Sequence, residues 1–161
     1  MWQNLAGNMA LLIKEYQKLL DLNEEKRRIL VRVDMKALEE LLSREESILN
    51  AIHKAENSRR EMLQEMASSN ADIRPDMRMV ELLHKCHNPE KRDQLHKLHI
   101  MLDKIVKDVQ AATDNNAIII KAALNAVNFR LNQLGGTSAD GGYGRGGKEH
   151  ITHEKNFDFQ A

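Results

Sequence analysis

The residues best suited to catalysis or metal binding lie close together around the single cysteine of this chain. Cys86 stands between His84 and His87 in the segment Leu-His-Lys-Cys-His-Asn-Pro. A histidine beside a cysteine can favour the thiolate, which is both a nucleophile and a metal ligand. The sequence supplies no evident oxyanion hole or substrate pocket to go with such a thiol. We therefore assign no catalytic residue and expect that the protein is not an enzyme.

The same region is a better candidate for a metal site, because His96 and His99 follow Cys86 and share one face of a predicted helix. It lacks the paired short ligand spacings of a zinc finger or a zinc ribbon. Histidines exposed around an interhelical turn are the simpler interpretation, so we expect no metal and no cofactor. His150 and His153, near the C-terminal end, are weaker candidates.

Residues 142–149 nearly spell a phosphate-binding loop, with the sequence Gly-Tyr-Gly-Arg-Gly-Gly-Lys-Glu. Glu149 replaces the hydroxyl residue that would bind magnesium, and no predicted strand precedes the loop. The glycine and arginine content is similar to that of RNA-binding tails, but residues 135–161 hold three basic and four acidic side chains. We expect neither nucleotide nor nucleic-acid binding.

The composition limits the class of protein. The chain has 161 residues, of which 42% are hydrophobic, 30% charged and 4% aromatic, and its formal net charge is zero. Such a length suits one domain with a buried core, and the many Leu, Ile, Ala and Met residues are typical of a helical protein. One cysteine permits no internal disulfide, and we find no signal peptide and no apolar run of about 20 residues. These features predict a cytoplasmic protein without stable membrane insertion.

Glycine divides the chain into two parts. Seven of the eight glycines lie between Gly135 and Gly147, which leaves Gly7 alone in the preceding 134 residues. Strong helix formers without glycine sustain long helices, whereas the glycine-rich segment cannot offset the entropy of ordering its backbone. We predict a helical domain over residues 1–134 and a disordered, flexible tail over residues 135–161.

Two apolar stripes of heptad type occupy the first half of the domain. The first runs from Leu5 towards Val33, with Asn23 and Lys26 as polar interruptions, and the β-branched residues before Asp34 predict a break there. The second runs from Leu38 to Met66, with Glu45 and Arg59 in its seam. Pro75 then predicts the first turn of a short helix that reaches about Lys85.

The longest predicted helix begins at Asn88-Pro89-Glu90, a cap followed by a first-turn proline, and meets no breaker before Gly135. At about 1.5 Å per residue it would be on the order of 70 Å long. Packing the three long helices along one another predicts an all-α, elongated antiparallel three-helix bundle of coiled-coil-like helices with one short helix. The stripe on the last helix is Leu95, Leu98, Leu102, Ile105, Val109, Ala112, Asn116, Ile119, Ala123, Val127, Leu131 and Leu134.

Four further apolar residues of the last helix lie off this stripe: Ile118, Ile120, Leu124 and Phe129. They suit a helix-in-groove contact with an amphipathic segment of a partner. They would equally complete the bundle core or form the seam of a homodimer. In the tail, Tyr143, Phe157 and Phe159 are apolar side chains without a core, and they are candidate docking elements.

The order of these elements resembles the FlgN-type flagellar export chaperones, which are small cytoplasmic helical proteins of bacteria. The resemblance covers nearly the whole chain and lies in an ordered series of short segments rather than in one diagnostic motif. These segments are residues 16–22 with Glu25 and Lys26, residues 33–38, residues 43–46 with Ile52, residues 124–129, the Tyr-Gly pair at Tyr143, and the ending Phe-Asp-Phe-Gln-Ala at residues 157–161.

The resemblance implies a chaperone that holds the C-terminal regions of the hook-filament junction proteins FlgK and FlgL and delivers them to the flagellar type III export gate. In that family a tail tyrosine is implicated in docking at the gate component FlhA, and Tyr143 is the matching residue here. A structural or adaptor coiled coil is the alternative, because the apolar stripes alone would suffice for it. A metal-sensing protein that uses the Cys86 region is a second alternative.

Overall fold

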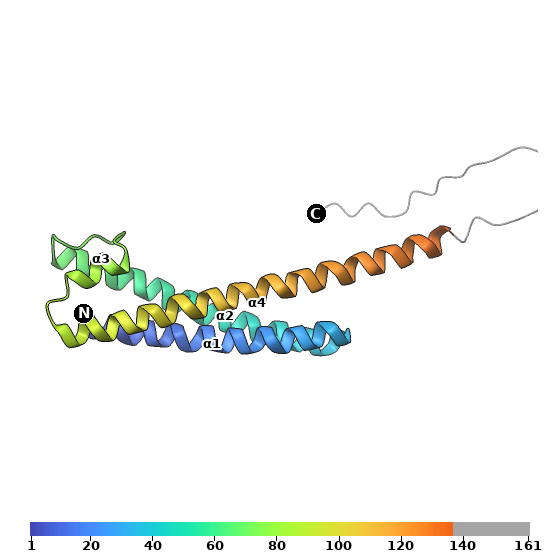
Figure 1. The fold of residues 1–161 in the computed structure, drawn as a ribbon, viewed down its shortest axis with the longest axis horizontal. Coiled ribbons are helices and arrows are strands. Elements are labelled where there is room, and N and C mark those ends of the chain that lie inside the picture. Colours follow the sequence, from blue (N-terminus) through green and yellow to red (C-terminus); the bar gives the residue numbers. More distant parts are fainter. Residues whose placement is uncertain (137–161) are drawn as a thin grey trace, which may run out of the picture. The chain divides into compact units, whose positions relative to one another are not determined.

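The computed structural model describes residues 1–136, which form helices joined by turns, without a strand among them (Figure 1). The chain divides into two compact units, Met1–Asn125 and Ala126–Ala161, and the packing described below is that of the first. The all-α prediction is confirmed for the described residues. The helices are α1 (Trp2–Arg32), α2 (Met35–Ser69), α3 (Met79–His84) and α4 (Pro89–Gly136).

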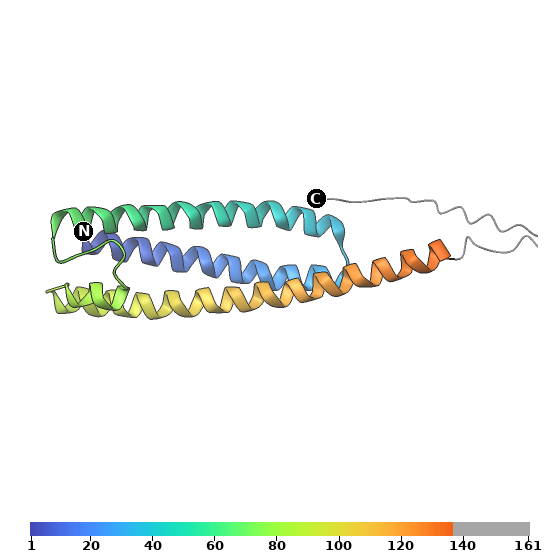
Figure 2. The same ribbon diagram turned by 90° about the horizontal axis from the view of Figure 1, so that it is seen from above.

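The predicted break between the first two helices is confirmed. Val33 adopts the left-handed conformation with φ 56°, and Asp34 caps α2 by accepting a 3.1 Å hydrogen bond from the backbone N–H of Ala37. The backbone N–H groups of Val33 and Asp34 donate to the carbonyl oxygens of Leu30 and Ile29, so they satisfy the end of α1. This turn reverses the chain, and α1 and α2 run side by side in opposite directions (Figures 1 and 2).

The left-handed conformation makes Val33 a strained position, because a Cβ in this region approaches the following carbonyl oxygen at a cost of roughly 1–2 kcal/mol. Val33→Gly is therefore expected to raise the free energy of unfolding by about 1 kcal/mol, measured by urea denaturation. Val31→Gly is the matched control, since Val31 is helical and glycine costs about 0.5 kcal/mol or more there. A loss of stability in both variants would contradict strain at Val33.

The sequence predicted that the apolar stripe of α1 extends to Val33, and this is wrong. The left-handed turn places the Val33 side chain in solvent, where 69% of it is exposed. Pro75 does not start a helix either. It lies in a turn, and α3 begins at Met79. The physical reason is Ile73, which is buried in the core and whose backbone N–H donates to the carbonyl oxygen of Asn70, so the chain is anchored before it can become helical.

Two clusters of buried side chains hold the first unit together. One joins α1, α2, α3, the loop residue Ile73 and the start of α4, and the other joins the middle of α1, α2 and α4. Both draw mainly on the predicted stripes, which confirms the helical periodicity. The first cluster is Leu5, Ala6, Met9, Leu63, Met66, Ile73, Leu82, Leu83 and Leu95, and the second is Leu12, Leu19, Ile52, Ala55 and Val109.

Four polar residues that interrupt the apolar stripes pair with one another between helices. Lys26 Nζ donates to both carboxylate oxygens of Glu45, at 3.0 and 2.8 Å. Asn116 Nδ2 donates to the backbone oxygen of Asn23 at 2.9 Å and to its side-chain Oδ1 at 3.1 Å. Since a buried polar group without a partner costs about 1–3 kcal/mol, these pairings make the interruptions compatible with the core.

A second ion pair lies beside that of Lys26 and Glu45 and also links α1 to α2. Arg44 donates from both terminal nitrogens to the two oxygens of Glu25, at 2.9 and 2.8 Å. These hydrogen bonds lower the pKa of the Glu25 carboxyl, and the nearby positive charges of Arg44 and Arg28 act in the same direction. The carboxylate therefore stays charged to lower pH than an isolated glutamate.

Candidate partner-binding surface on α4

The burial of α4 changes along its length. Leu95, Ile105, Val109 and Asn116 are buried, and Ile119 is half-buried. Every residue from Ile120 to Gly135 is exposed, although the predicted apolar stripe continues through them. The last third of α4 therefore presents to solvent the kind of surface that its first part packs into the core.

The four candidate residues on α4 are all exposed, so they do not complete the core of this chain. The exposed fraction is 67% for Ile118, 37% for Ile120, 58% for Leu124 and 63% for Phe129, which lies in the second compact unit. The interpretation that they fill the bundle core is wrong for the isolated chain. Two interpretations of these residues are left: contact with a partner protein, or contact with a second copy of this chain.

Helix geometry separates these four residues into two groups. Ile120 follows Leu102, a partly buried residue that packs against both core clusters, by 18 residues, about five turns of roughly 3.6 residues, so it lies on the same face. Leu124 is one turn further on, and we call the surface formed by Ile120 and Leu124 the open face. Ile118 and Phe129 each lie about 160–180° away from Ile120, on the reverse face.

The open face continues the buried face of α4, so its side chains are those that a packed helix would cover. Val127 and Leu131 repeat the same spacing and are also exposed. The sequence placed Ile120 and Leu124 off the main stripe, whereas their positions agree with the core face within about 40°. Counting whole turns from Leu102 would have found this from the sequence alone.

The cysteine and histidine cluster forms no site in the described part of the chain. Cys86 is buried in the turn before α4, with its Sγ 3.6 Å from the carbonyl oxygen of Asn88, while His84 and His87 are exposed. Within residues 1–136, no three His, Cys, Asp or Glu side chains gather closely enough to hold a metal ion. His150, His153, Tyr143, Phe157 and Phe159 lie outside the described residues.

The sequence did not predict a hollow of about 380 Å³ on the first unit that combines apolar and polar side chains. Tyr16 lines it next to Glu56 and Arg59, which form an ion pair at 2.9 Å. Partial burial raises the pKa of the Tyr16 hydroxyl, and the negative charge of Glu56 adds to this effect. One feature of the sequence could have indicated this hollow. Arg59 interrupts the predicted apolar seam, and a charge in an apolar stripe requires a polar partner nearby.

The described residues also contain no helix that is both long and apolar enough to cross a membrane. The structure thus defines a class of protein: residues 1–136 are helices joined by turns, and the longest helix keeps an apolar face in solvent, as partner-binding helical proteins do.

The family comparison agrees with this class. The family model described as FlgN protein matches residues 1–151, so the chain belongs to the FlgN family, and the resemblance seen in the sequence is confirmed. Membership of this chaperone family suggests a flagellar export chaperone. Comparisons with curated proteins and with solved structures gave no match.

Proposed function

We propose that the protein is a cytoplasmic export chaperone that holds the C-terminal helical segments of FlgK and FlgL and delivers them to the flagellar type III export gate. Membership of the FlgN family supports the chaperone class. The observation that carries the client site is the open face of α4, where Ile120 and Leu124 continue the core face but remain exposed.

An amphipathic helix of the client would lie along the open face with its own apolar side chains against Ile120 and Leu124. Fully burying one leucine or isoleucine contributes about 1.5–3 kcal/mol, and these two side chains are already partly covered. Each contact therefore contributes roughly 1–2 kcal/mol. A site built from a few such contacts binds with intermediate affinity, which suits a chaperone that must release its client.

The charge of this part of α4 also favours apolar recognition. Between Asn115 and Gly136 the charged residues are Lys121 and Arg130, with no acidic residue, while five asparagines supply neutral polar groups. An interface with few charges loses little affinity when salt screens electrostatic attraction. Ile118 and Phe129 lie on the reverse face, out of reach of a single helix on the open face, so we assign the primary client contact to Ile120 and Leu124 and keep Ile118 and Phe129 as candidates for a second client segment.

Delivery to the gate is assigned to Tyr143, which matches the tail tyrosine of the family and lies outside the described residues. Tyr143→Ala is expected to leave the affinity for FlgK and FlgL segments unchanged and to reduce both binding to FlhA and swimming motility. Tyr143→Phe is the matched control, since it keeps the ring and removes only the hydroxyl. A fully motile Tyr143→Ala strain would contradict the docking role.

Co-purification tests the function as a whole. The chaperone should bring down FlgK and FlgL at a defined stoichiometry from a flagellated strain, whereas a structural or adaptor coiled coil would bring down other proteins. Light scattering on the purified complex distinguishes a client on the open face from a second copy there. A homodimer that does not dissociate when client is added would contradict the assignment of this face to the client.

A further inference from the structure

The turn between α1 and α2 exposes three apolar side chains in close succession. Val31, Val33 and Met35 are each between 66% and 69% exposed. Helix-connecting turns usually carry glycine or polar residues, and Val33 here adopts the left-handed conformation at an energetic cost. Strain that persists in an exposed segment is a reason to look for a function of the side chain that causes it.

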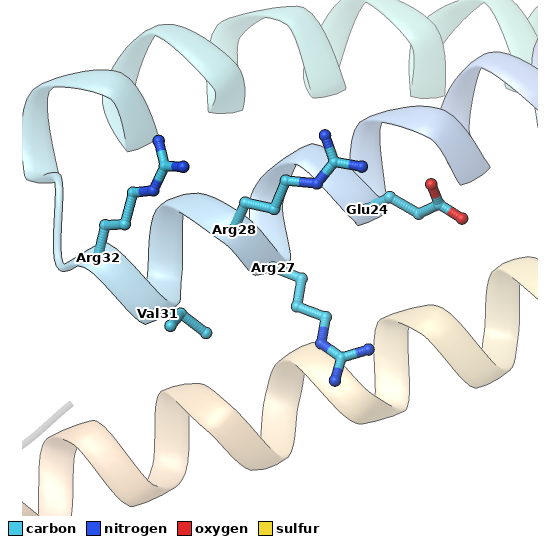
Figure 3. A pocket seen from close by; sticks show the side chains of 5 residues that line it. All are labelled: Glu24, Arg27, Arg28, Val31 and Arg32. Carbon is cyan, nitrogen blue, oxygen red and sulfur yellow. The ribbon is translucent and has the colours of Figure 1, made fainter.

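Three arginines stand beside this turn. They line an open hollow of about 430 Å³ on the last two turns of α1, together with Glu24 and Val31 (Figure 3). Arg28 and Arg32 project to one side of the helix, whereas Arg27 and Val31 project to the other (Figure 3). We call the surface formed by Arg27, Arg28, Val31, Arg32 and Val33 the hairpin tip.

The hairpin tip carries excess positive charge. Within residues 1–136, no carboxylate lies within ion-pair distance of the side chains of Arg27, Arg28 or Arg32, and Glu24 is the single acidic residue that lines the hollow. The nearby Glu25 carboxylate already accepts two hydrogen bonds from Arg44. A cation near the end of a helix interacts favourably with the helix dipole, which explains Arg32 but not the exposed valines.

We propose that the hairpin tip binds an acidic amphipathic segment of a partner protein. The guanidinium groups are the donors that recognise carboxylates through two parallel hydrogen bonds, and Val31 and Val33 supply the apolar contact between them. A membrane surface fits less well, because the tip has no Trp, Tyr or Phe. The charge and apolar pattern thus point to carboxylates alternating with aliphatic side chains.

This site differs in chemistry from the open face of α4, although Arg27 and Val31 project from α1 towards α4 (Figure 3). The open face is apolar with neutral amides around it, whereas the hairpin tip is basic and lies at the turn between α1 and α2. The two surfaces therefore favour partner segments of different chemistry.

Fluorescence anisotropy with labelled helical peptides of roughly 18 residues, five helical turns, tests the proposal on the full chain. The probe peptide has leucine on one face and glutamate on the other, and two matched peptides replace all glutamates by lysine or all leucines by serine. The glutamate–leucine peptide should bind about tenfold more tightly than either, and more weakly as salt is raised. Arg28→Glu and Arg32→Glu should each weaken its binding about tenfold, whereas Lys14→Glu on the same helix should not.

Val33→Gly separates binding from folding. It should weaken binding of the glutamate–leucine peptide about fivefold, since it removes an apolar contact, and at the same time make the chain more stable. Leu124→Ala removes apolar surface of the open face without adding a charge, and it should leave this binding unchanged. Equal binding of the three peptides would overturn the proposal, and so would binding of vesicles of phosphatidylglycerol and phosphatidylcholine with the same dependence on Arg28.

Discussion

Leu124→Asp is expected to weaken the binding of FlgK and FlgL C-terminal segments by about 10–100-fold, and Ile120→Asp by a similar factor. A carboxylate in an apolar contact loses its hydration without gaining a partner, and about 1.4 kcal/mol of lost binding free energy is a tenfold change in affinity. Leu124 is exposed in the free chain, so the substitution should change the free energy of unfolding of the chain by no more than about 0.5 kcal/mol. Isothermal titration calorimetry measures the first effect and circular dichroism the second.

Ala122→Asp is the matched control, because Ala122 is exposed on the same stretch of α4 and faces away from Ile120 and Leu124. It places the same charge about 160° away from Ile120, on the side of Ile118 and Phe129. Unchanged affinity in Leu124→Asp would reject the open face as the client site. If Ala122→Asp or Ile118→Asp weakens binding as much as Leu124→Asp, the client surrounds the helix rather than lying along the open face.

Asn116→Asp is expected to lower the free energy of unfolding by about 3–5 kcal/mol near neutral pH, the range seen when a buried charge lacks a partner. Asn116 is 3% exposed, and its Nδ2 donates to two oxygens of Asn23. A carboxylate would bring an acceptor against these acceptors. Urea denaturation of the variant and of the natural chain at the same pH measures the difference.

The pH dependence of this variant has a definite sign. Burial favours the neutral acid, so the pKa of the introduced carboxyl rises in the folded state above its unfolded value of about 3.9. The stability penalty is therefore small at low pH, where the acid is protonated in both states, grows as the pH rises from the unfolded pKa to the raised folded pKa, and is constant above it. Asn115→Asp introduces the same group at an exposed neighbour and should show neither effect. Similar behaviour of the two variants would contradict the buried Asn23–Asn116 pairing.

Local signals in the sequence predicted most of the helix boundaries. Asp34 as a cap and Asn88-Pro89 as a helix start act within one turn of backbone, and the structure places boundaries at both. The prediction of a helix start at Pro75 was wrong. The local preference of proline for a first helical turn is overridden there by Ile73, which packs in the core against residues from distant segments. The partners of Asn23 and Lys26 are also distant in sequence, so the stripes revealed the interruptions but not their pairing.

The candidate site was harder to predict for a different reason. Ile120 and Leu124 have the same spacing and chemistry as the residues that fill the core, so nothing local distinguishes a covered apolar residue from an open one. The four candidates were found because the last helix has more apolar residues than one seam needs. Their division into an open and a reverse face follows from counting turns from Leu102, but the finding that the open face stays uncovered required the structure.

The hydrogen bonds between Asn23 and Asn116 also fix the register of the helices. A seam of similar aliphatic residues would tolerate a shift of α4 by one heptad, because leucine would meet leucine again. After such a shift Val109 or Ala123 would stand opposite Asn23, and a buried amide would lose its donor. The pair therefore determines how much of the apolar stripe remains uncovered, so the length of surface offered to a client is set by one polar contact inside the core.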